Sequence, residues 1–275
     1  MKTSPQEDCS KKTIRNHGEA TVYLINGKKK TIKKVIRLDR NKICHELVMN
    51  SILKCLKNCL TYYKFRKQDE TNETIYTLHF NYGGETLEDY IKNNTLSKIE
   101  KKNIMLQILD GIDGIHERGV IHMDLKTENI LVKNGNINII DFGNSVRTVL
   151  YEKMNRFGNM CTIYFTSPEA ILDLRVTYKH DIFSTAMVFY YIWYGNDYYK
   201  VYSKTEVVEH MFKDRNGLHL MDKYEYLEEY ISSCNKHYKS PREEKGFDGL
   251  FYSMSHLHPE KRPTLEEIRK IVRDL

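Results

Sequence analysis

The segment from residue 122 to 143, HMDLKTENILVKNGNINIIDFG, constrains this chain more than any other. Asp124 is followed two residues later by Lys126 and five residues later by Asn129. An apolar, strand-like run then leads into Asp141, the first residue of an Asp-Phe-Gly triplet. Carboxylate and amide oxygens are the hard ligands that Mg²⁺ prefers, and a positioned lysine neutralises the charge of a phosphate. The spacing therefore predicts a site for phosphoryl chemistry. The alternative reading is a polar loop with a solvent-facing aspartate.

This segment resembles the catalytic loop and the metal-binding aspartate of the eukaryotic protein kinase family. The resemblance implies that Asp124 orients a substrate hydroxyl and that Lys126 contacts the transferred phosphate. It implies that Asn129 and Asp141 hold Mg²⁺, with Mn²⁺ as an alternative, and that ATP is the phosphate donor. A lysine two residues after the aspartate is typical of the serine/threonine subclass, because tyrosine kinases usually place arginine and alanine here.

Met123 stands where the family usually has an arginine between the histidine and the aspartate. His122 is expected to be structural, as in the family, packing and hydrogen-bonding within the loop rather than reacting. The family arginine binds a phosphate on the activation loop. Its replacement predicts that activity does not require phosphate on Ser145, Thr148 or Tyr151.

The first part of the chain is predicted to contain strands around one helix. Residues 21–25, 31–38 and 75–80 have strand character, and residues 43–60 have helical character. The Asn-Gly pair between the first two strands is typical of a type I′ hairpin turn, since both turn positions need positive φ.

The second of these strands resembles the family strand that carries the ATP-anchoring lysine. By register we choose Lys33, with Lys34 as the rival, because strand residues alternate faces and only one of the two can point into the cleft. Glu46 is the expected helix partner of this lysine, although the spacing of 13 residues is shorter than usual in the family. A solvated helix glutamate is the alternative.

Residues 14–22 occupy the place of the family's glycine-rich loop. The family has glycine where this chain has Arg15, His17 and Ala20, and only Gly18 is present, one position off. Side chains at these positions limit the approach of backbone amides to phosphate. This departure puts either tight ATP binding or the usual loop conformation in doubt, with Arg15 or His17 as a substitute phosphate contact.

The resemblance assigns the other nucleotide contacts to apolar residues. Val22 would cover the adenine ring, and the hinge segment 78–82, including Leu78 and Phe80, would offer backbone groups to adenine. The Tyr-Gly-Gly sequence at residues 82–84 is predicted to be a turn and the hinge between two lobes.

Residues 161–169, CTIYFTSPE, resemble the end of an activation segment. Thr162 stands where serine/threonine kinases keep a threonine bonded to the catalytic aspartate and lysine. The resemblance also predicts a buried structural pair between Glu169 and Arg262, because losing one partner would strand the other charge. Asp181 resembles the helix aspartate that holds the catalytic-loop backbone.

The C-terminal part of the chain is predicted to be helical. Ile104, Ile108, Ile112 and Ile115 recur at helical spacing and predict a long amphipathic helix that ends near Gly119. A Thr-x-x-Asp sequence at residues 86–89 resembles a capping box that opens a helix, and the pattern is helical and tyrosine-rich from residue 167 onward.

The predicted fold class is therefore α+β, with the bilobal protein-kinase architecture. We expect a small, mostly antiparallel β N-terminal lobe and a larger α-helical C-terminal lobe. The expected boundaries are a polar N-terminal tail over residues 1–13, the N-lobe over residues 14–82 and the C-lobe over residues 83–275.

Composition adds few constraints. The 275 residues carry a net charge of +6, which permits anionic partners without arguing for them. Six cysteines form no CxxC pair, so reduced thiols are expected. The apolar stretch from residue 182 to 193 is too short for a bilayer and predicts a buried core helix. We expect no signal peptide, no membrane contact, no direct nucleic-acid partner, and a cytoplasmic or nuclear location.

The leading functional hypothesis is an active kinase that phosphorylates serine or threonine in proteins. A pseudokinase that acts as a binding or scaffold regulator is the alternative, favoured by the altered glycine loop and by Met123, and opposed by the intact catalytic and metal-binding residues. A small-molecule kinase of the aminoglycoside type is a third reading, but those enzymes lack the Ser-Pro-Glu sequence and the equivalent of Arg262.

The substrate prediction rests on Glu128 and on the length and composition of the chain. Basophilic family members use a glutamate two residues after the catalytic lysine to meet an arginine near the acceptor, although a glutamate here also occurs in kinases of other specificities. The compact, Lys-, Asn- and Tyr-rich chain also looks like kinases of large DNA viruses such as baculoviruses, which act on small basic proteins. We therefore expect a protein substrate that is small and basic.

Overall fold

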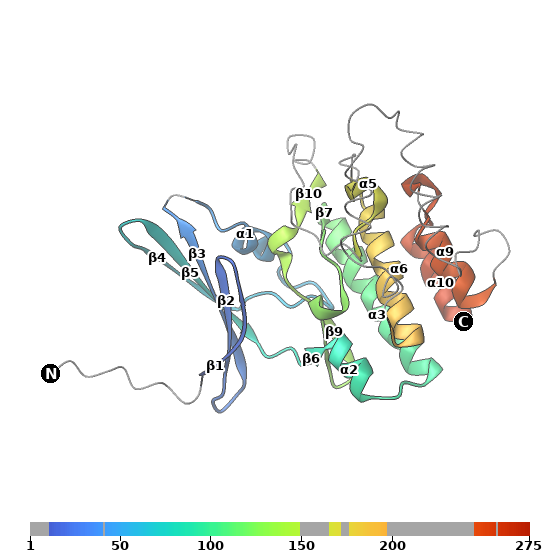
Figure 1. The fold of residues 1–275 in the computed structure, drawn as a ribbon, viewed down its shortest axis with the longest axis horizontal. Helices are drawn as coiled ribbons and strands as arrows, with labels where there is room; N and C mark the ends of the chain where they lie inside the picture. Colours follow the sequence, from blue (N-terminus) through green and yellow to red (C-terminus); the bar gives the residue numbers. More distant parts are fainter. Residues whose placement is uncertain (1–10, 41, 149–164, 172–175, 197–244, 257) are drawn as a thin grey trace.

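The computed structural model describes residues 11–40, 42–148, 165–171, 176–196, 245–256 and 258–275. The described chain forms a β-rich N-terminal lobe and a mostly helical C-terminal lobe (Figure 1). This confirms the predicted α+β fold class. None of the described helices is both long enough and apolar enough to cross a membrane.

The N-lobe is a five-stranded antiparallel sheet with the order β1-β2-β3-β5-β4. Its strands are β1 (Lys11–His17), β2 (Ala20–Ile25), β3 (Thr31–Asp39), β4 (Lys64–Asp69) and β5 (Glu73–Asn81). One helix, α1 (His45–Ile52), belongs to this lobe. One face of the sheet is turned toward the C-lobe (Figure 1).

The register of the sheet decides which side chains share that face. Arg15 lies opposite Val22, Val22 opposite Lys34, and Lys34 opposite Leu78. Directly opposed residues of antiparallel strands point to the same side, so these four form one row. We call the side that carries this row the inner face.

The inner face holds the small core of the N-lobe. Ile36 and Tyr76 are paired across β3 and β5, and both are buried. The buried cluster on this side contains Ile36, Cys44, Tyr62, Tyr76, Leu78 and Phe80, with Leu47 of α1 packed against it. α1 is therefore held against the same face that carries the row with Lys34.

Four expectations about the N-lobe are corrected. β1 begins at Lys11, so residues 11–13 belong to the sheet rather than to a tail. The strand β4 was not expected at all. α1 ends at Ile52 instead of continuing to residue 60, because Cys55 and Asn58 both take left-handed backbone angles that a helix cannot contain.

The fourth correction concerns the Asn-Gly hairpin. Ile25 pairs with Thr31, so the loop spans residues 26–30 and is too long for a two-residue type I′ turn. Neither Asn26 nor Gly27 has positive φ, as that turn would require. The pair marks the hairpin correctly, but three exposed lysines extend the loop before pairing resumes.

Two chain segments cross between the lobes and lie in contact. After α1, the backbone of residues 58–60 bonds to Ile139: Ile139 N donates to Asn58 O at 2.8 Å, and Leu60 N donates to Ile139 O at 2.9 Å. The second crossing follows β5, where a Cβ on Gly83 would meet Leu60 Cδ2 at 2.9 Å. The expected hinge at residues 82–84 is thus packed tightly against the first crossing.

The described C-lobe contains two small sheets, β6-β8-β9 and β10-β7, and a set of helices. Its described strands are β6 (Glu85–Thr86), β7 (Val120–Ile121), β8 (Ile130–Lys133), β9 (Asn136–Ile139) and β10 (Val146–Arg147). Its described helices are α2 (Leu87–Asn93), α3 (Lys98–Glu117), α5 (Pro168–Ile171), α6 (Lys179–Tyr194), α9 (Gly246–Met254) and α10 (Leu265–Asp274).

α3 is the central helix of this lobe, and its prediction is confirmed. Ser97 and Glu100 form a reciprocal capping box at its start. Gly119 follows its end with φ +68, the left-handed angle that commonly terminates helices. The four isoleucines that predicted the helix are all buried.

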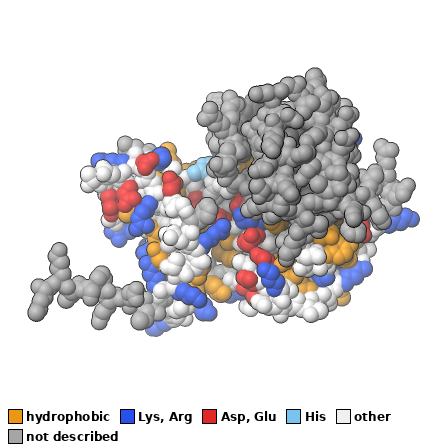
Figure 2. All heavy atoms as spheres, in the orientation of Figure 1, with side chains coloured by type: hydrophobic (Ala, Val, Ile, Leu, Met, Phe, Trp, Pro, Cys, Tyr) orange, Lys and Arg blue, Asp and Glu red, His pale blue; other side chains and the backbone are white. Residues whose placement is uncertain are grey.

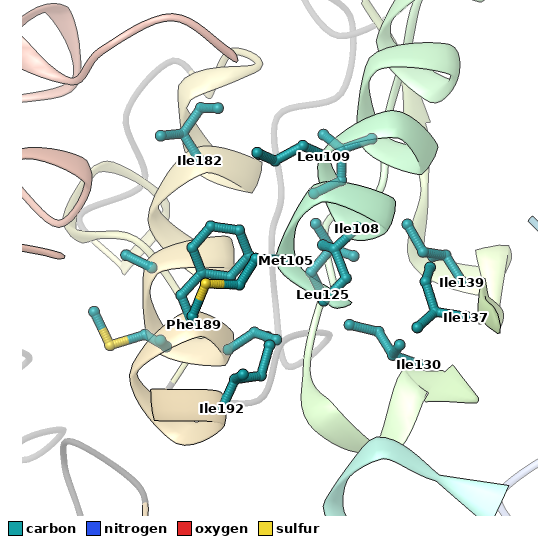
Figure 3. Packing of buried hydrophobic residues seen from close by; sticks show 14 of the residues in the cluster. Met105, Ile108, Leu109, Leu125, Ile130, Ile137, Ile139, Ile182, Phe189 and Ile192 are labelled. Carbon is teal, nitrogen blue, oxygen red and sulfur yellow. The ribbon is translucent and has the colours of Figure 1, made fainter. Parts of the chain in front are cut away.

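α3 and α6 bury their apolar side chains against each other and against β8 and β9. Figure 3 shows Met105, Ile108 and Leu109 of α3 between Phe189 of α6 and the isoleucines of β9. The expected core helix over residues 182–193 is α6. This core supports the loop between β7 and β8, which contains Asp124.

The described surface is mixed in charge. In Figure 2, Lys and Arg side chains lie beside Asp and Glu side chains over both lobes. On this face the described residues show an ordinary solvated surface rather than a single-sign field.

Candidate functional site

Asp181 of α6 holds the backbone of the loop that contains Asp124. Asp181 Oδ2 accepts a hydrogen bond from His122 N at 2.9 Å, and Oδ1 accepts one from Met123 N at 3.2 Å. His116 Nε2 lies 2.8 Å from the same carboxylate. Burial alone would raise the pKa of Asp181, but the hydrogen bond and charge of His116 outweigh it and lower the pKa. The carboxylate is thus placed to hold the loop backbone, as its sequence position predicted.

His122 is fully buried and is bonded through both ring nitrogens. Nδ1 accepts from Asp124 N at 3.2 Å, so a neutral ring carries its proton on Nε2, which lies 3.1 Å from the carbonyl of Ile140. The ring also packs edge-on against Phe142 at 5.2 Å. This geometry links the loop with Asp124 to the segment with Asp141 through both ring nitrogens of His122.

Asp124, Lys126 and Asn129 form one bonded group. Lys126 Nζ lies 3.0 and 2.8 Å from the two carboxylate oxygens of Asp124. Asn129 Nδ2 donates to the Asp124 carbonyl at 2.8 Å and to its Oδ2 at 3.1 Å. Asn129 sits in a 3₁₀ turn just before β8. The loop therefore brings together three of the four residues expected from the sequence.

Lys34, not Lys33, carries the expected lysine contact. Lys34 Nζ lies 2.6 Å from Glu46 Oε2 and 2.9 Å from Asp141 Oδ1. Register explains the correction, because Lys34 lies in the row of Val22 and Leu78 on the inner face. Lys33 pairs with Tyr23 and His79, on the opposite side of the sheet.

The charges of Lys34 and Asp141 stabilise each other. Burial alone would lower the pKa of Lys34, but Glu46 and Asp141 outweigh it and raise the pKa. Burial alone would raise the pKa of Asp141, but Lys34 and then Arg15 outweigh it and lower the pKa. Burial raises the pKa of Glu46 against the pull of Lys34. The trio thus presents a charged lysine and an ionised Asp141.

Asp141 takes an unusual backbone conformation, with φ +66. Non-glycine residues in this left-handed region are uncommon, and they often occur at functional sites. Behind it, Ser145 O lies 2.6 Å from His45 Nε2 of α1, which connects the segment after Asp141 to the helix that carries Glu46.

Asn129 and Asp141 fit the requirements of a Mg²⁺ site. The side-chain Oδ1 of Asn129 is buried and accepts no hydrogen bond within the described part of the chain. A buried carbonyl oxygen without a partner is costly, and a metal ion would satisfy it. No group of three or more His, Cys, Asp and Glu side chains in the described ranges is arranged to hold a metal. The two residues therefore suit a Mg²⁺ that takes further oxygen ligands from phosphates.

Glu169 and Arg262 form the predicted buried pair. Arg262 Nη1 and Nη2 donate to the two carboxylate oxygens of Glu169, each at 2.7 Å. The guanidinium also lies 5.1 Å from the ring centre of Phe183. Burial alone would raise the pKa of Glu169, but the hydrogen bonds and charge of Arg262 outweigh it and lower the pKa. This bidentate pair fastens α5 to the segment before α10.

The remaining predicted residues have mixed outcomes. Val22, Leu78 and Phe80 all lie on the inner face, with Leu78 fully buried. Gly18 forms the tight turn between β1 and β2 with φ +53. Glu128 lies in the 3₁₀ turn beside Asn129. Thr162 falls outside the described residues.

Sequence reasoning missed three contacts that support the site. These are the bond of His116 to Asp181, the bond of His45 to Ser145 O, and the burial of Met123 in an apolar cluster. Histidines at helix ends give no local signal of a partner more than 60 residues away. Met123 could have been found, because an apolar residue in a polar loop often marks a buried contact.

Comparison with known proteins agrees with this geometry. The family model for the protein kinase domain matches residues 14–272, which is nearly the whole chain. This chain belongs to the protein kinase family. The ion trio of Lys34, Glu46 and Asp141 and the group around Asp124 both lie within the matched residues.

Known kinases share part of this sequence. Calcium-dependent protein kinase 4 of Plasmodium falciparum is 30% identical over 198 residues, covering 67% of this chain and 35% of the relative. Protein kinase kin1 of Schizosaccharomyces pombe is 32% identical over 206 residues, covering 72% of this chain and 20% of the relative. The chain thus spans about a third or less of the length of these relatives, and what they share is the kinase domain.

Proposed function

We propose that this kinase transfers the γ-phosphate of ATP to a serine or threonine hydroxyl of a protein substrate, with Mg²⁺ as the metal. The observation that carries this proposal is Lys34 Nζ, which contacts Glu46 and Asp141 at once. That contact connects the inner face of the N-lobe to the metal-binding segment. A binding module without catalysis would have no need of this arrangement together with an intact Asp124 group.

Asp124 and Lys126 perform complementary tasks in this reaction. Asp124 orients the acceptor hydroxyl and receives its proton as the oxygen bonds to phosphorus and the bond from phosphorus to the ADP oxygen breaks. Lys126 neutralises negative charge next to the acceptor. In the structure its ammonium already contacts both oxygens of Asp124, so it also holds the carboxylate in one orientation.

Asn129 and Asp141 would hold the metal, whose charge neutralises phosphate oxygens in the transition state. The amide of Asn129 donates to Asp124 through Nδ2, which leaves its Oδ1 for the metal. Lys34 keeps Asp141 ionised. Asn129 thus bonds to the catalytic carboxylate, and Lys34 to the metal-binding one.

The assignment to serine and threonine rests on two observations. Lys126 is the residue typical of that subclass, and its contact with Asp124 at 2.8 Å supports this assignment. The relative from pea that matches 46% of this chain carries the name calcium and calcium/calmodulin-dependent serine/threonine-protein kinase.

The test compares wild type with Asp124→Asn and with Glu117→Gln, an exposed acid at the end of α3. Asp124→Asn keeps the shape and removes the base, so phosphate transfer from radiolabelled ATP to a basic protein should fall by at least about 10²-fold. Thermal unfolding should stay close to wild type, and Glu117→Gln should retain full transfer. Unchanged transfer by folded Asp124→Asn would contradict the proposal and favour the pseudokinase reading.

We also propose that the substrate carries basic residues near the acceptor. Glu128 is half-buried in the turn beside the catalytic group, where its carboxylate accepts from Thr127 Oγ1 at 3.1 Å. One carboxylate oxygen is thereby oriented and the charge remains available to an arginine. The overall charge of +6 opposes this preference at long range, so the contact must act locally.

A peptide array checks this substrate preference. Basic peptides should be phosphorylated best by wild type, and Glu128→Ala should reduce the preference for arginine about tenfold, as expected for a charge-assisted hydrogen bond, while turnover of the best neutral peptide stays within twofold. An array led by acidic or proline-directed peptides would exclude a basic substrate.

A further inference from the structure

Arg15 lies where the kinase family has a glycine, and the register of the β1-β2 hairpin fixes its position. The turn at Gly18 joins β1 to β2 so that His17 pairs with Ala20 and Arg15 with Val22. In a hairpin the turn fixes the register, and a slip by one residue would move every side chain to the other face. The single glycine of this loop therefore sets Arg15 on the inner face, in the row with Lys34.

The ladder is broken immediately before this residue. The pairing shifts between Thr13 and Arg15, which leaves Ile14 as an extra, half-exposed residue. Bulges of this kind occur beside active sites, where they re-aim a side chain or change the twist of a strand. Only the part of β1 after the bulge keeps the register that the turn imposes.

The guanidinium of Arg15 reaches Asp141 across the two lobes. Arg15 Nη1 lies 3.9 Å from Asp141 Oδ2, while Lys34 Nζ lies 2.9 Å from Oδ1. The two cations therefore flank the metal-binding carboxylate from the same row of the sheet. About half of the Arg15 side chain is exposed, against 13% for Lys34. At 3.9 Å the contact is electrostatic rather than a hydrogen bond, so the guanidinium donors stay available to a ligand.

We propose that Arg15 binds the phosphates of the nucleotide, in place of the backbone amides that a glycine-rich loop would supply. The proposal rests on the function proposed above. An arginine presents several donors in a planar fork that matches phosphate oxygens, often in a bidentate manner. Its charge, together with that of Lys34, offsets part of the charge of a triphosphate, which backbone amides do only through partial charges.

The specific ligand class is a nucleoside di- or triphosphate rather than a nucleoside. Arg15 faces Asp141, the residue that would hold the metal, and Val22, its neighbour in the row, is the residue expected over adenine. A contact at this place acts on the phosphate part of the ligand. Arg15 should therefore distinguish ATP from adenosine.

The test measures binding of ATP, ADP and adenosine to the full chain by calorimetry in the presence of Mg²⁺. Arg15→Ala should weaken ATP binding about tenfold or more, the usual size of a hydrogen bond to a charged group, and should change adenosine binding less than twofold. Arg15→Lys should recover part of the loss, since it restores the charge but not the fork. Lys33→Ala, which removes a cation from the opposite side of the sheet, is the matched control and should bind all three as wild type does.

Each other outcome overturns the proposal. Equal losses for ATP and adenosine would show that Arg15 supports the fold of the loop. A lower unfolding temperature of the Arg15 variants would show the same. Tighter ATP binding by Arg15→Ala would show that the ion pair with Asp141 is an inhibitory lock. Because binding is measured without transfer, a wild type that binds ATP but phosphorylates nothing refutes the proposed function alone. A wild type that does not bind ATP refutes both.

Discussion

At the scale of single residues, Lys34 is the side chain on which the two lobes depend most directly. Its ammonium separates two carboxylates, Glu46 and Asp141, that would otherwise repel each other. Replacing Lys34 with methionine should lower kcat/KM by at least about 10²-fold, because a positioned charge at the phosphates is lost. Lys33→Met should stay within about twofold of wild type.

Steady-state kinetics with varied ATP measures both variants, and circular dichroism controls for folding. A large loss in Lys33→Met, with Lys34→Met active, would return the lysine to the position expected from sequence. The comparison is sharp because the two substitutions are chemically identical and adjacent.

The same pair of residues shows how far sequence could go at this scale. The spacing around Asp124 and Asp141 was sufficient to select these residues as candidates, because they lie in one short segment with one possible register. Lys33 and Lys34 differ only in the face of a strand, which depends on pairing with β2 and β5. The sequence spacing to Glu46 could not decide the choice either, because the two lysines are adjacent and differ by one residue in that spacing.

At the scale of elements, an apolar contact joins the catalytic loop to the segments around it. Met123 is buried in one cluster with Ile121, Val146, Ala170 and Val176, drawn from β7, β10, α5 and the segment before α6. Methionine thus fastens these elements by packing, where the family arginine would need a phosphate. Ser145 is also fully buried, and its Oγ donates to His122 O at 3.1 Å, so its hydroxyl is not available for modification in this state.

Complete dephosphorylation should therefore leave kcat/KM unchanged. The measurement treats the purified protein with a protein phosphatase, verifies removal by mass spectrometry, and compares activity before and after. Met123→Leu, a substitution of similar volume, should cost less than about 1.5 kcal/mol of stability. The activity of this variant should also be unchanged by dephosphorylation. Loss of activity after treatment, regained on rephosphorylation, would show that packing does not replace the phosphate.

Elements with strong periodic patterns were predicted well, and polar edges were not. α3 and α6 carry many apolar residues, and these predicted both that the segments are helical and roughly where the helices lie. β1 and β4 contain lysines and other polar residues at almost every position, and all six residues of β4 are exposed. As edge strands they gain their order from backbone bonding to a neighbour, and edge lysines are a common protection against wrong pairing. Such strands leave no alternating pattern to read.

At the scale of the whole molecule, Gly84 limits how the lobes are joined. It has φ +108, and a Cβ at this position would lie 1.9 Å from Val132 O, a backbone atom that cannot move aside. Gly84→Ala should lower the free energy of unfolding by about 2 to 4 kcal/mol, from backbone strain and overpacking together. Gly135→Ala is the control, since Gly135 also has positive φ but no atom within 4 Å of the added carbon.

The control should lose only about 1 kcal/mol, the usual cost of a left-handed angle for alanine. Chemical denaturation of the three proteins measures the difference. Equal losses for the two variants would mean that strain alone matters and that the backbone at Gly84 can relax away from Val132.

The contact between the two crossings has a mechanical consequence. Because Gly83 lies against Leu60, and because Asn58 O and Leu60 N are both bonded to Ile139, the two chain connections of the N-lobe meet at one pivot. Two attachments far apart would allow only a stiff flexing of the sheet, whereas one pivot permits rotation. Rotation about such a point moves distant atoms most, so β1 and its arginine would travel farther than Lys34 while the residues at the pivot stay almost still.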